Sequence, residues 1–222
     1  MATAELEVRP ETTTRSLVGE QRLLIPDVSY SFYKIFCEEI GERPLRLSFT
    51  DGDLEIMVTK RPHEYFKKVL AKLLEQLVFC LNIPVASGGN MTFQRDDLEK
   101  GFEPDECWWI AHEAIVRSKE EFDFTVDPPP DLAIEIEISH SLVNRISIYA
   151  AMQVPEIWRY DGTQLRFCVL QPDGTYESAP YSLAFPFLAP SDLEPFLPFD
   201  PSKDETSRLR EFVDWIRSQN VE

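Results

Sequence analysis

Apolar and polar residues alternate along residues 131–138, which read Asp-Leu-Ala-Ile-Glu-Ile-Glu-Ile. Leucine and isoleucine occupy the even positions, so the pattern predicts a β-strand with one face in the core. Glu135 and Glu137 stand on the opposite face, where strand geometry separates their Cβ atoms by roughly 6.5–7 Å. That separation suits two carboxylates that share a divalent cation, or one ligand beside one base. The acidic face is therefore either a metal site or a solvated surface.

Apolar residues at helical spacing predict four helices, at residues 28–40, 62–81, 142–152 and 206–218. In the first helix, Pro26-Asp27 is expected to form the cap, and Phe32, Ile35 and Phe36 lie on one side. The second helix is the longest, and a proline suits its first turn.

Two β-hairpins are predicted because alternating runs flank an Asp-Gly pair. The runs are residues 45–49 and 54–58 in the first hairpin, and residues 156–160 and 164–169 in the second. Two more strands are expected at residues 83–93, interrupted by two glycines, and at residues 103–110, whereas residues 96–100 and 112–127 are expected to be connectors. The strand at 131–138, its helix and the strand at 156–160 suggest a βαβ-like crossover.

These elements predict an α/β (α+β) fold, in which helices flank a mixed central sheet. An N-terminal helix and hairpin and a C-terminal helix complete it. Residues 1–20 are polar and are expected to be a disordered tail. Residues 21–170 form the core domain, and the proline-rich segment 171–222 is expected to wrap its surface and end in the last helix of the same domain.

Composition bears on where in the cell the protein is expected. No run approaches the roughly 18 apolar residues that span a bilayer, and the first residues lack the pattern of a secretory signal. The four cysteines form no CxxC pair, so reduced thiols in a cytoplasmic protein are expected rather than a zinc site. We therefore expect a cytoplasmic protein without a membrane partner.

The charge balance bears on nucleic-acid binding. The chain has 39 acidic and 22 basic residues and a net charge of −17, whereas nucleic-acid-binding domains are usually basic. Binding to DNA would therefore need a local basic surface or a metal ion that neutralises the acids. Residues 60–72 contain a basic cluster that includes Lys67 and Lys68. Such a cluster is more often a solvated helix face than a phosphate-binding one.

The acidic residues suggest a chemistry. Asp105 heads one strand, and Glu135 lies within another some 30 residues later. Mg²⁺ or Mn²⁺ prefers oxygen ligands such as these, and either ion helps to hydrolyse phosphodiesters. Glu137 is then a further ligand or the base for the attacking water. Asp131, roughly 13 Å from Glu135 along a strand, is expected to serve a turn or cap.

The runs at residues 103–105, 130–135, 148–151 and 154–158 resemble the Uma-type family of restriction endonucleases. That family is similar in fold to the PD-(D/E)xK nucleases, and the likeness covers roughly residues 45–160. The resemblance implies that Asp105 and Glu135 match the acidic motif residues that bind the metal. It also implies that His63 and Glu64 open the long helix near the site, and that the protein is a homodimer.

The lysine of the PD-(D/E)xK motif would fall at position 137, where this chain has Glu. Relatives in the resembled family place a lysine in the following helix, and the matching residue here is Arg145. Arginine does not deprotonate, so it cannot be a base, but it can contact a phosphate or steady Glu137.

We therefore expect a Mg²⁺- or Mn²⁺-dependent endonuclease that cleaves DNA, with Lys67 and Lys68 as the local basic surface. Two alternatives stay open: a nuclease-like fold that has lost turnover and serves as a binding or assembly protein, and a metal-dependent hydrolase of small phosphorylated substrates.

Overall fold

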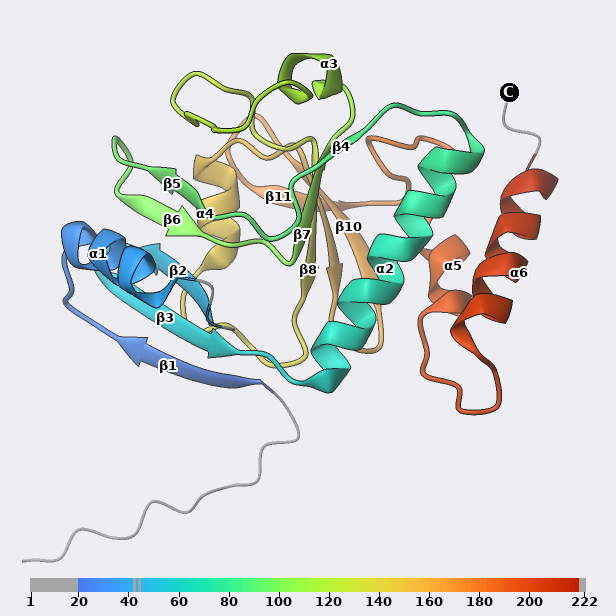
Figure 1. The fold of residues 1–222 in the computed structure, drawn as a ribbon, viewed down its shortest axis with the longest axis horizontal. Helices are drawn as coiled ribbons and strands as arrows, with labels where there is room; N and C mark the ends of the chain where they lie inside the picture. The colour runs from blue at the N-terminus through green and yellow to red at the C-terminus, as the bar shows by residue number, and fades with distance from the viewer. Residues whose placement is uncertain (1–19, 42, 44, 220–222) are drawn as a thin grey trace, which may run out of the picture.

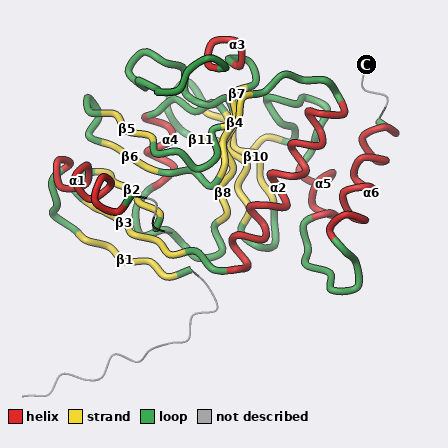
Figure 2. Tube along the Cα trace, in the orientation of Figure 1, coloured by secondary structure: helices red, strands yellow, loops and turns green. Residues whose placement is uncertain are grey.

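Two β-sheets organise the chain in the computed structural model, which describes residues 20–41, 43 and 45–219 (Figures 1 and 2). Sheet A has five strands in the order β1-β3-β2-β6-β5, and sheet B has six in the order β11-β10-β9-β8-β7-β4. Helices pack on both sheets, which confirms the predicted α+β class with a mixed sheet. Of the predicted tail at residues 1–20, residues 1–19 lie outside the described part of the chain.

Sheet A is antiparallel throughout. Its strands are β1 (Gln21–Ile25), β2 (Arg46–Thr50), β3 (Asp53–Val58), β5 (Phe93–Arg95) and β6 (Lys100–Phe102). Asp51 and Gly52, with φ of 53° and 87°, join β2 to β3. A positive φ at both central residues gives the turn a twist that matches the strands, which explains why the predicted hairpin is confirmed.

Sheet B carries the crossover. Its strands are β4 (Ala86–Ser87), β7 (Glu106–Trp109), β8 (Leu132–Ile136), β9 (Glu156–Tyr160), β10 (Leu165–Leu170) and β11 (Tyr176–Ala179). β8 runs parallel to β9 and reaches it through α4 (Arg145–Ala151), which confirms the predicted βαβ connection. β9 and β10 form the second predicted hairpin.

Two layers cover the two faces of sheet B (Figure 1). On one face, α2 (Arg61–Cys80) packs against β8, and α6 (Glu205–Ser218) packs against α2. On the other face lie α4 and the β5–β6 end of sheet A, so Tyr149, Phe93 and Phe102 share one core with Trp109 and Ala133. β8 is consequently buried on both sides.

The shorter elements complete the described chain. They are α1 (Tyr30–Ile40), α3 (Glu113–Val116), α5 (Pro190–Leu193) and the 3₁₀ turn η1 (Glu194–Phe196). Asp131 accepts hydrogen bonds from the backbone N–H groups of Ile110 and His112, at 2.7 and 3.0 Å, which agrees with the predicted turn or cap role. Among the described helices, none combines the length and apolar character needed to cross a membrane.

Two sequence predictions about the first helix were wrong. Ser29, not Asp27, caps α1, and the helix buries Tyr33 against Phe49 while Phe32 and Ile35 stay 43% and 59% exposed. The apolar face therefore follows the tyrosines, whose rings stack on sheet A.

The expected single strand at residues 83–93 is divided between two sheets, because β4 pairs with β7 and β5 pairs with β6. Gly88 lies at this division, and a Cβ there would come within 2.7 Å of the Cys107 Sγ. The expected connector at residues 96–100 contributes Lys100 to β6.

Candidate active site

Asp105 and Glu135 meet at the end of the β7–β8 ladder. Glu106 pairs with Ile134 in the antiparallel register, and continuing that register by one residue places Asp105 across from Glu135. Cβ atoms at such positions are roughly 4.5–5.5 Å apart. Both residues are buried, at 1% and 7% exposure, so the alternative of a merely solvated acidic face does not hold at Glu135. The α4 layer covers this end of the sheet.

Asp105 is held by groups from three elements. His63 Nε2 lies 2.8 Å from Oδ1, and the backbone N–H of Ile136 donates to Oδ2 at 2.8 Å. Arg46 Nη2 is 3.9 Å from Oδ1. Burial opposes ionisation of Asp105, but the bond to His63 and the charges of His63 and Arg46 lower its pKa to about 2. Asp105 is thus a carboxylate at neutral pH.

His63 bridges two buried acids. Its Nδ1 lies 2.6 Å from Glu20 Oε1, while its Nε2 faces Asp105. Burial would lower the pKa of His63, yet the two carboxylates raise it to about 9, so the imidazole is protonated at neutral pH. Glu20 is also bonded to Arg22 and Ser139, and its pKa falls to about 2 despite burial. The sequence placed Glu20 in the tail, whereas the structure makes it a buried support of the site.

Glu135 is anchored from α4 and open on one side. Arg145 Nη2 donates to Glu135 Oε1 at 2.6 Å, and the Tyr149 hydroxyl donates to the same oxygen. Burial raises the pKa of Glu135; Arg145 lowers it in part, and the negative charge of Asp105 raises it further. Oε2 accepts no hydrogen bond from any described residue. This oxygen is therefore available to a cation or a substrate.

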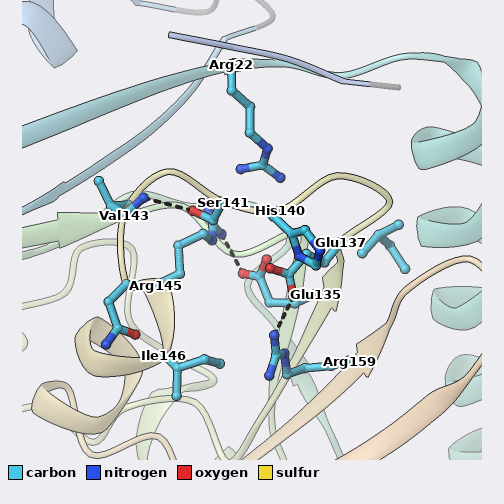
Figure 3. Close-up of a pocket in the computed structure, with 11 residues that line it drawn as sticks. Arg22, Glu135, Glu137, His140, Ser141, Val143, Arg145, Ile146 and Arg159 are labelled. Carbon is cyan, nitrogen blue, oxygen red and sulfur yellow. Dashed lines mark hydrogen bonds and ion pairs between the residues drawn. The ribbon is translucent and has the colours of Figure 1, made fainter. Parts of the chain in front are cut away.

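A pocket of about 190 Å³ opens beside Glu135 (Figure 3). Charged side chains from four segments converge on it: Arg22, Glu135, Glu137, Arg145 and Arg159. Polar residues of the β8–α4 loop, His140, Ser141 and Asn144, line the rest of its wall with backbone and apolar groups. β1 brings Arg22 to the pocket, although that strand is far from β8 in sequence.

Arg145 does not steady Glu137. Its other contacts are Ser48 Oγ at 2.7 Å and the Glu103 carbonyl oxygen at 2.9 Å, so it joins sheet A to Glu135. Glu137 instead accepts a hydrogen bond from Arg159 on the neighbouring strand β9. The alternative role given to Arg145 from the sequence, as partner of Glu137, is therefore wrong.

The predicted basic residues on α2 do not form one shared surface. Lys67 is buried, and its Nζ lies 3.6 Å from Glu64. Lys68 is exposed and pairs with Glu106 at 3.1 Å. Burial opposes ionisation of Glu64, but a hydrogen bond with Thr59 and the positive charges of Lys67, His63 and Arg46 lower its pKa. Lys67 thus borders the buried acid–base cluster, whereas Lys68 faces solvent.

Five residues of this site were not predicted from the sequence: Glu20, Arg22, Arg46, Tyr149 and Arg159. The apolar run Leu23-Leu24-Ile25 just before Pro26 is the one local signal for the short strand that carries the first two. The other residues lie in segments whose apolar pattern indicated core positions.

At the end of the β7–β8 ladder, Asp105 and Glu135 are the pair of acidic side chains that lie across from each other. Within the described chain, no cluster of three or more His, Cys, Asp or Glu side chains is arranged to hold a metal ion. A Mg²⁺ site needs only one or two protein carboxylates because water fills the remaining positions. The donor set of Asp105 and the free oxygen of Glu135 therefore fits such an ion.

The comparisons with known proteins agree with this architecture. A crystal structure described as a "putative nuclease belonging to DUF820" from Anabaena variabilis ATCC 29413 superposes with a TM-score of 0.51 at 14% sequence identity. The superposition covers 85% of this chain and 99% of that one, so the two share a fold. Among curated proteins, none matches the chain. The sequence profile of the Uma2 family, described as "Putative restriction endonuclease", matches residues 30–202. Since this match spans most of the chain, the protein belongs to the Uma2 family.

Proposed function

We propose that the protein is a Mg²⁺- or Mn²⁺-dependent endonuclease that hydrolyses phosphodiester bonds in DNA. The observation that carries the proposal is the placement of Asp105 and Glu135 across from each other at the end of the β7–β8 ladder, beside a charged pocket. Membership of the Uma2 family supports a nucleic acid as the substrate.

The charge state of the two acids supports a bound cation. Asp105 is ionised, and its charge helps to raise the pKa of the neighbouring Glu135 carboxyl. Two carboxylates in such proximity repel each other, and a divalent cation between them removes this cost. The unbonded Oε2 of Glu135 and the second lone pairs of the Asp105 oxygens are the donors that would hold the ion. When bound, the ion stabilises charge on the phosphate and acidifies a water molecule.

The surrounding residues of the chain keep the two acids in place. His63 and the backbone of β8 orient Asp105, while Arg145 and Tyr149 occupy one oxygen of Glu135 and leave the other toward the pocket. We assign Arg145 to positioning, since its nitrogens Nη1 and Nη2 are already bonded within the protein. Pre-positioned donors of this kind need little rearrangement during the reaction.

The local charge of the pocket differs from that of the whole chain. Three arginines and two glutamates line it, although the net charge of the protein is −17. A bound divalent cation adds further positive charge at the same place. Attraction of DNA is therefore proposed to be confined to this pocket and to depend on the metal, with a shallow salt dependence because few phosphates are contacted.

A plasmid-nicking assay tests the proposal. The purified protein should convert supercoiled plasmid to the nicked form with Mg²⁺ or Mn²⁺, and Glu135→Gln should cut at least 100-fold more slowly, because it removes a charged ligand. Glu177→Gln, on the exposed edge strand β11, is the matched control and should cut like the parent. Equal cutting by Glu135→Gln and the parent would refute the assignment.

One observation favours a second function, that of a nuclease-like binding or assembly protein without turnover. Among the described residues that line the pocket, none is a lysine, and Glu137 occupies the lysine position of the PD-(D/E)xK motif. No Mn²⁺ heat signal in titration calorimetry would support this alternative. Cleavage of nucleotides but not of plasmid would instead indicate a hydrolase of small phosphorylated substrates.

A further inference from the structure

The three arginines of the pocket differ in how fully they are engaged. Arg22 bonds to Ser139, Glu55 and Glu20 through its three side-chain nitrogens, and its side chain is 7% exposed. Arg145 is similarly buried at 9%. The guanidiniums of Arg22 and Arg145 are thus committed mainly to protein oxygens, and they build the walls of the pocket.

Arg159 is bonded differently. Its Nη2 donates to a single carboxylate, that of Glu137, and 32% of its side chain is exposed. The guanidinium also hydrogen-bonds to the Cys168 sulfur, whereas Nε and Nη1 donate to no oxygen of a described residue. Arg159 therefore retains N–H donors for a ligand that enters the pocket (Figure 3).

The strand register places these donors next to the candidate metal ligand. Glu135 and Arg159 are paired across the parallel strands β8 and β9, and Glu137 follows two residues later. Both side chains line the same pocket. A phosphate bound to an ion at Glu135 would consequently meet Arg159 on the β9 side.

We infer that Arg159 binds the phosphate on which the protein acts, and that Glu137 positions Arg159 rather than serving as a base or a metal ligand. The planar fork of a guanidinium suits two phosphate oxygens, and one edge remains for Glu137. Glu137 occupies the lysine position of the motif, and its partner Arg159 supplies the positive charge that the lysine would otherwise provide. The inference rests on the proposed function for its reaction, but binding of a phosphodiester can be measured without turnover.

The cleavage arm of the test uses plasmid nicking with Mn²⁺. Arg159→Gln should lower kcat roughly 100-fold, the usual effect of losing one donor to the reacting charge. Arg159→Lys should recover most of this loss, and Glu137→Gln should fall between the two. Arg166→Gln is the matched control, since Arg166 is paired with Arg159 across β9 and β10 but bonds to Asp161 outside the pocket. It should behave like the parent.

A second arm measures binding of a fluorescent duplex oligonucleotide by anisotropy at several salt concentrations. Arg159→Gln should reduce the slope of log affinity against log salt by about one, because one phosphate contact is lost. Mn²⁺ affinity of Arg159→Gln, measured by calorimetry, should equal or exceed that of the parent because a nearby cation is removed. A purely structural role would instead weaken metal binding together with activity.

The two arms separate the failure of the inference from that of the proposed function. If the parent binds duplex but does not cut, the proposed function fails and the salt slope alone decides the role of Arg159. If Arg159→Gln matches the parent in the slope and in any cutting the parent shows, the inference is wrong. If the parent neither cuts nor binds, both are wrong.

Discussion

Glu135 and Glu137 are two residues apart in the chain, yet their surroundings differ sharply. Glu135 lies under α4, where Arg145 and Tyr149 hold one of its oxygens and 7% of the residue is exposed. Glu137 lies past the end of β8, and its partner Arg159 is partly exposed. The same residue type on the same side of one strand thus faces a closed environment in one case and an open one in the other.

We call the surroundings of Glu135 the closed half of the site and those of Glu137 the open half. The closed half also contains Asp105, His63 and Glu20, which are all almost fully buried. Charges in such a region are screened little by solvent, so each needs a partner in order to be tolerated. Charges in the open half are solvated, so their pairing contributes little to folding. The comparison teaches that substitutions in the closed half should alter stability, whereas those in the open half should alter activity alone.

The largest effect is expected for Arg145→Met. This change leaves Glu135 buried without its cation and should lower the free energy of unfolding by about 3–5 kcal/mol at pH 7 in urea denaturation with EDTA. The difference in unfolding free energy between variant and parent should narrow at pH 5, because Glu135 of the variant can then be protonated. Arg166→Met, which breaks an exposed ion pair, should cost less than about 1 kcal/mol. An Arg145→Met variant as stable as this control would contradict the closed environment.

The next effect is a pH dependence that arises from His63. Its pKa rises from 6.5 to about 9 on folding, so its stabilisation is complete below pH 6.5 and is lost as the pH rises through about 9. At about 1.4 kcal/mol per pKa unit, the parent should lose about 3 kcal/mol between pH 5.5 and pH 9. In urea denaturation, His63→Gln should lack this loss. Parallel pH profiles for the two proteins would show that the buried bridge does not carry a proton.

The smallest effect on folding is expected for Glu137→Gln. Its ion pair with Arg159 is 26% and 32% exposed, so the loss should lower the unfolding free energy by less than about 1 kcal/mol. Thermal unfolding should therefore be nearly unchanged although cutting slows. A destabilisation as large as that of Arg145→Met would show that Glu137 is as little solvated as Glu135, and would contradict the difference between the two halves.

Elements with strong local signals could be predicted from the sequence. The leucine stripe of α2 and the Asp51-Gly52 hairpin follow from spacing and turn chemistry, both of which act over a few residues. β1, and the division of the predicted strand at residues 83–93 into β4 and β5 in two sheets, could not be predicted, because strands of five, two and three residues derive their stability from pairing with distant partners. The buried face of α1 likewise depends on which residues meet Phe49.

The site divides in a similar way. The motif at Asp105 and Glu135 could be found in the sequence because its residues lie near recognisable strands. Their partners could not, since Glu20 reaches His63 over 43 positions and Arg145 reaches Ser48 over 97. The pairing of Glu137 with Arg159, rather than with Arg145, depends on the parallel register of β8 and β9. Such contacts follow from topology and not from local pattern.

The central claim is that the carboxyl groups of Asp105 and Glu135 together bind one divalent ion. Anomalous diffraction from crystals soaked in Mn²⁺ tests it most directly, with Glu135→Gln crystals treated in the same way as the comparison. The proposal predicts one strong peak between Asp105 and Glu135 Oε2 in the parent and a much weaker one in the variant. A parent map without a peak there, or with equal peaks in both proteins, would contradict the claim.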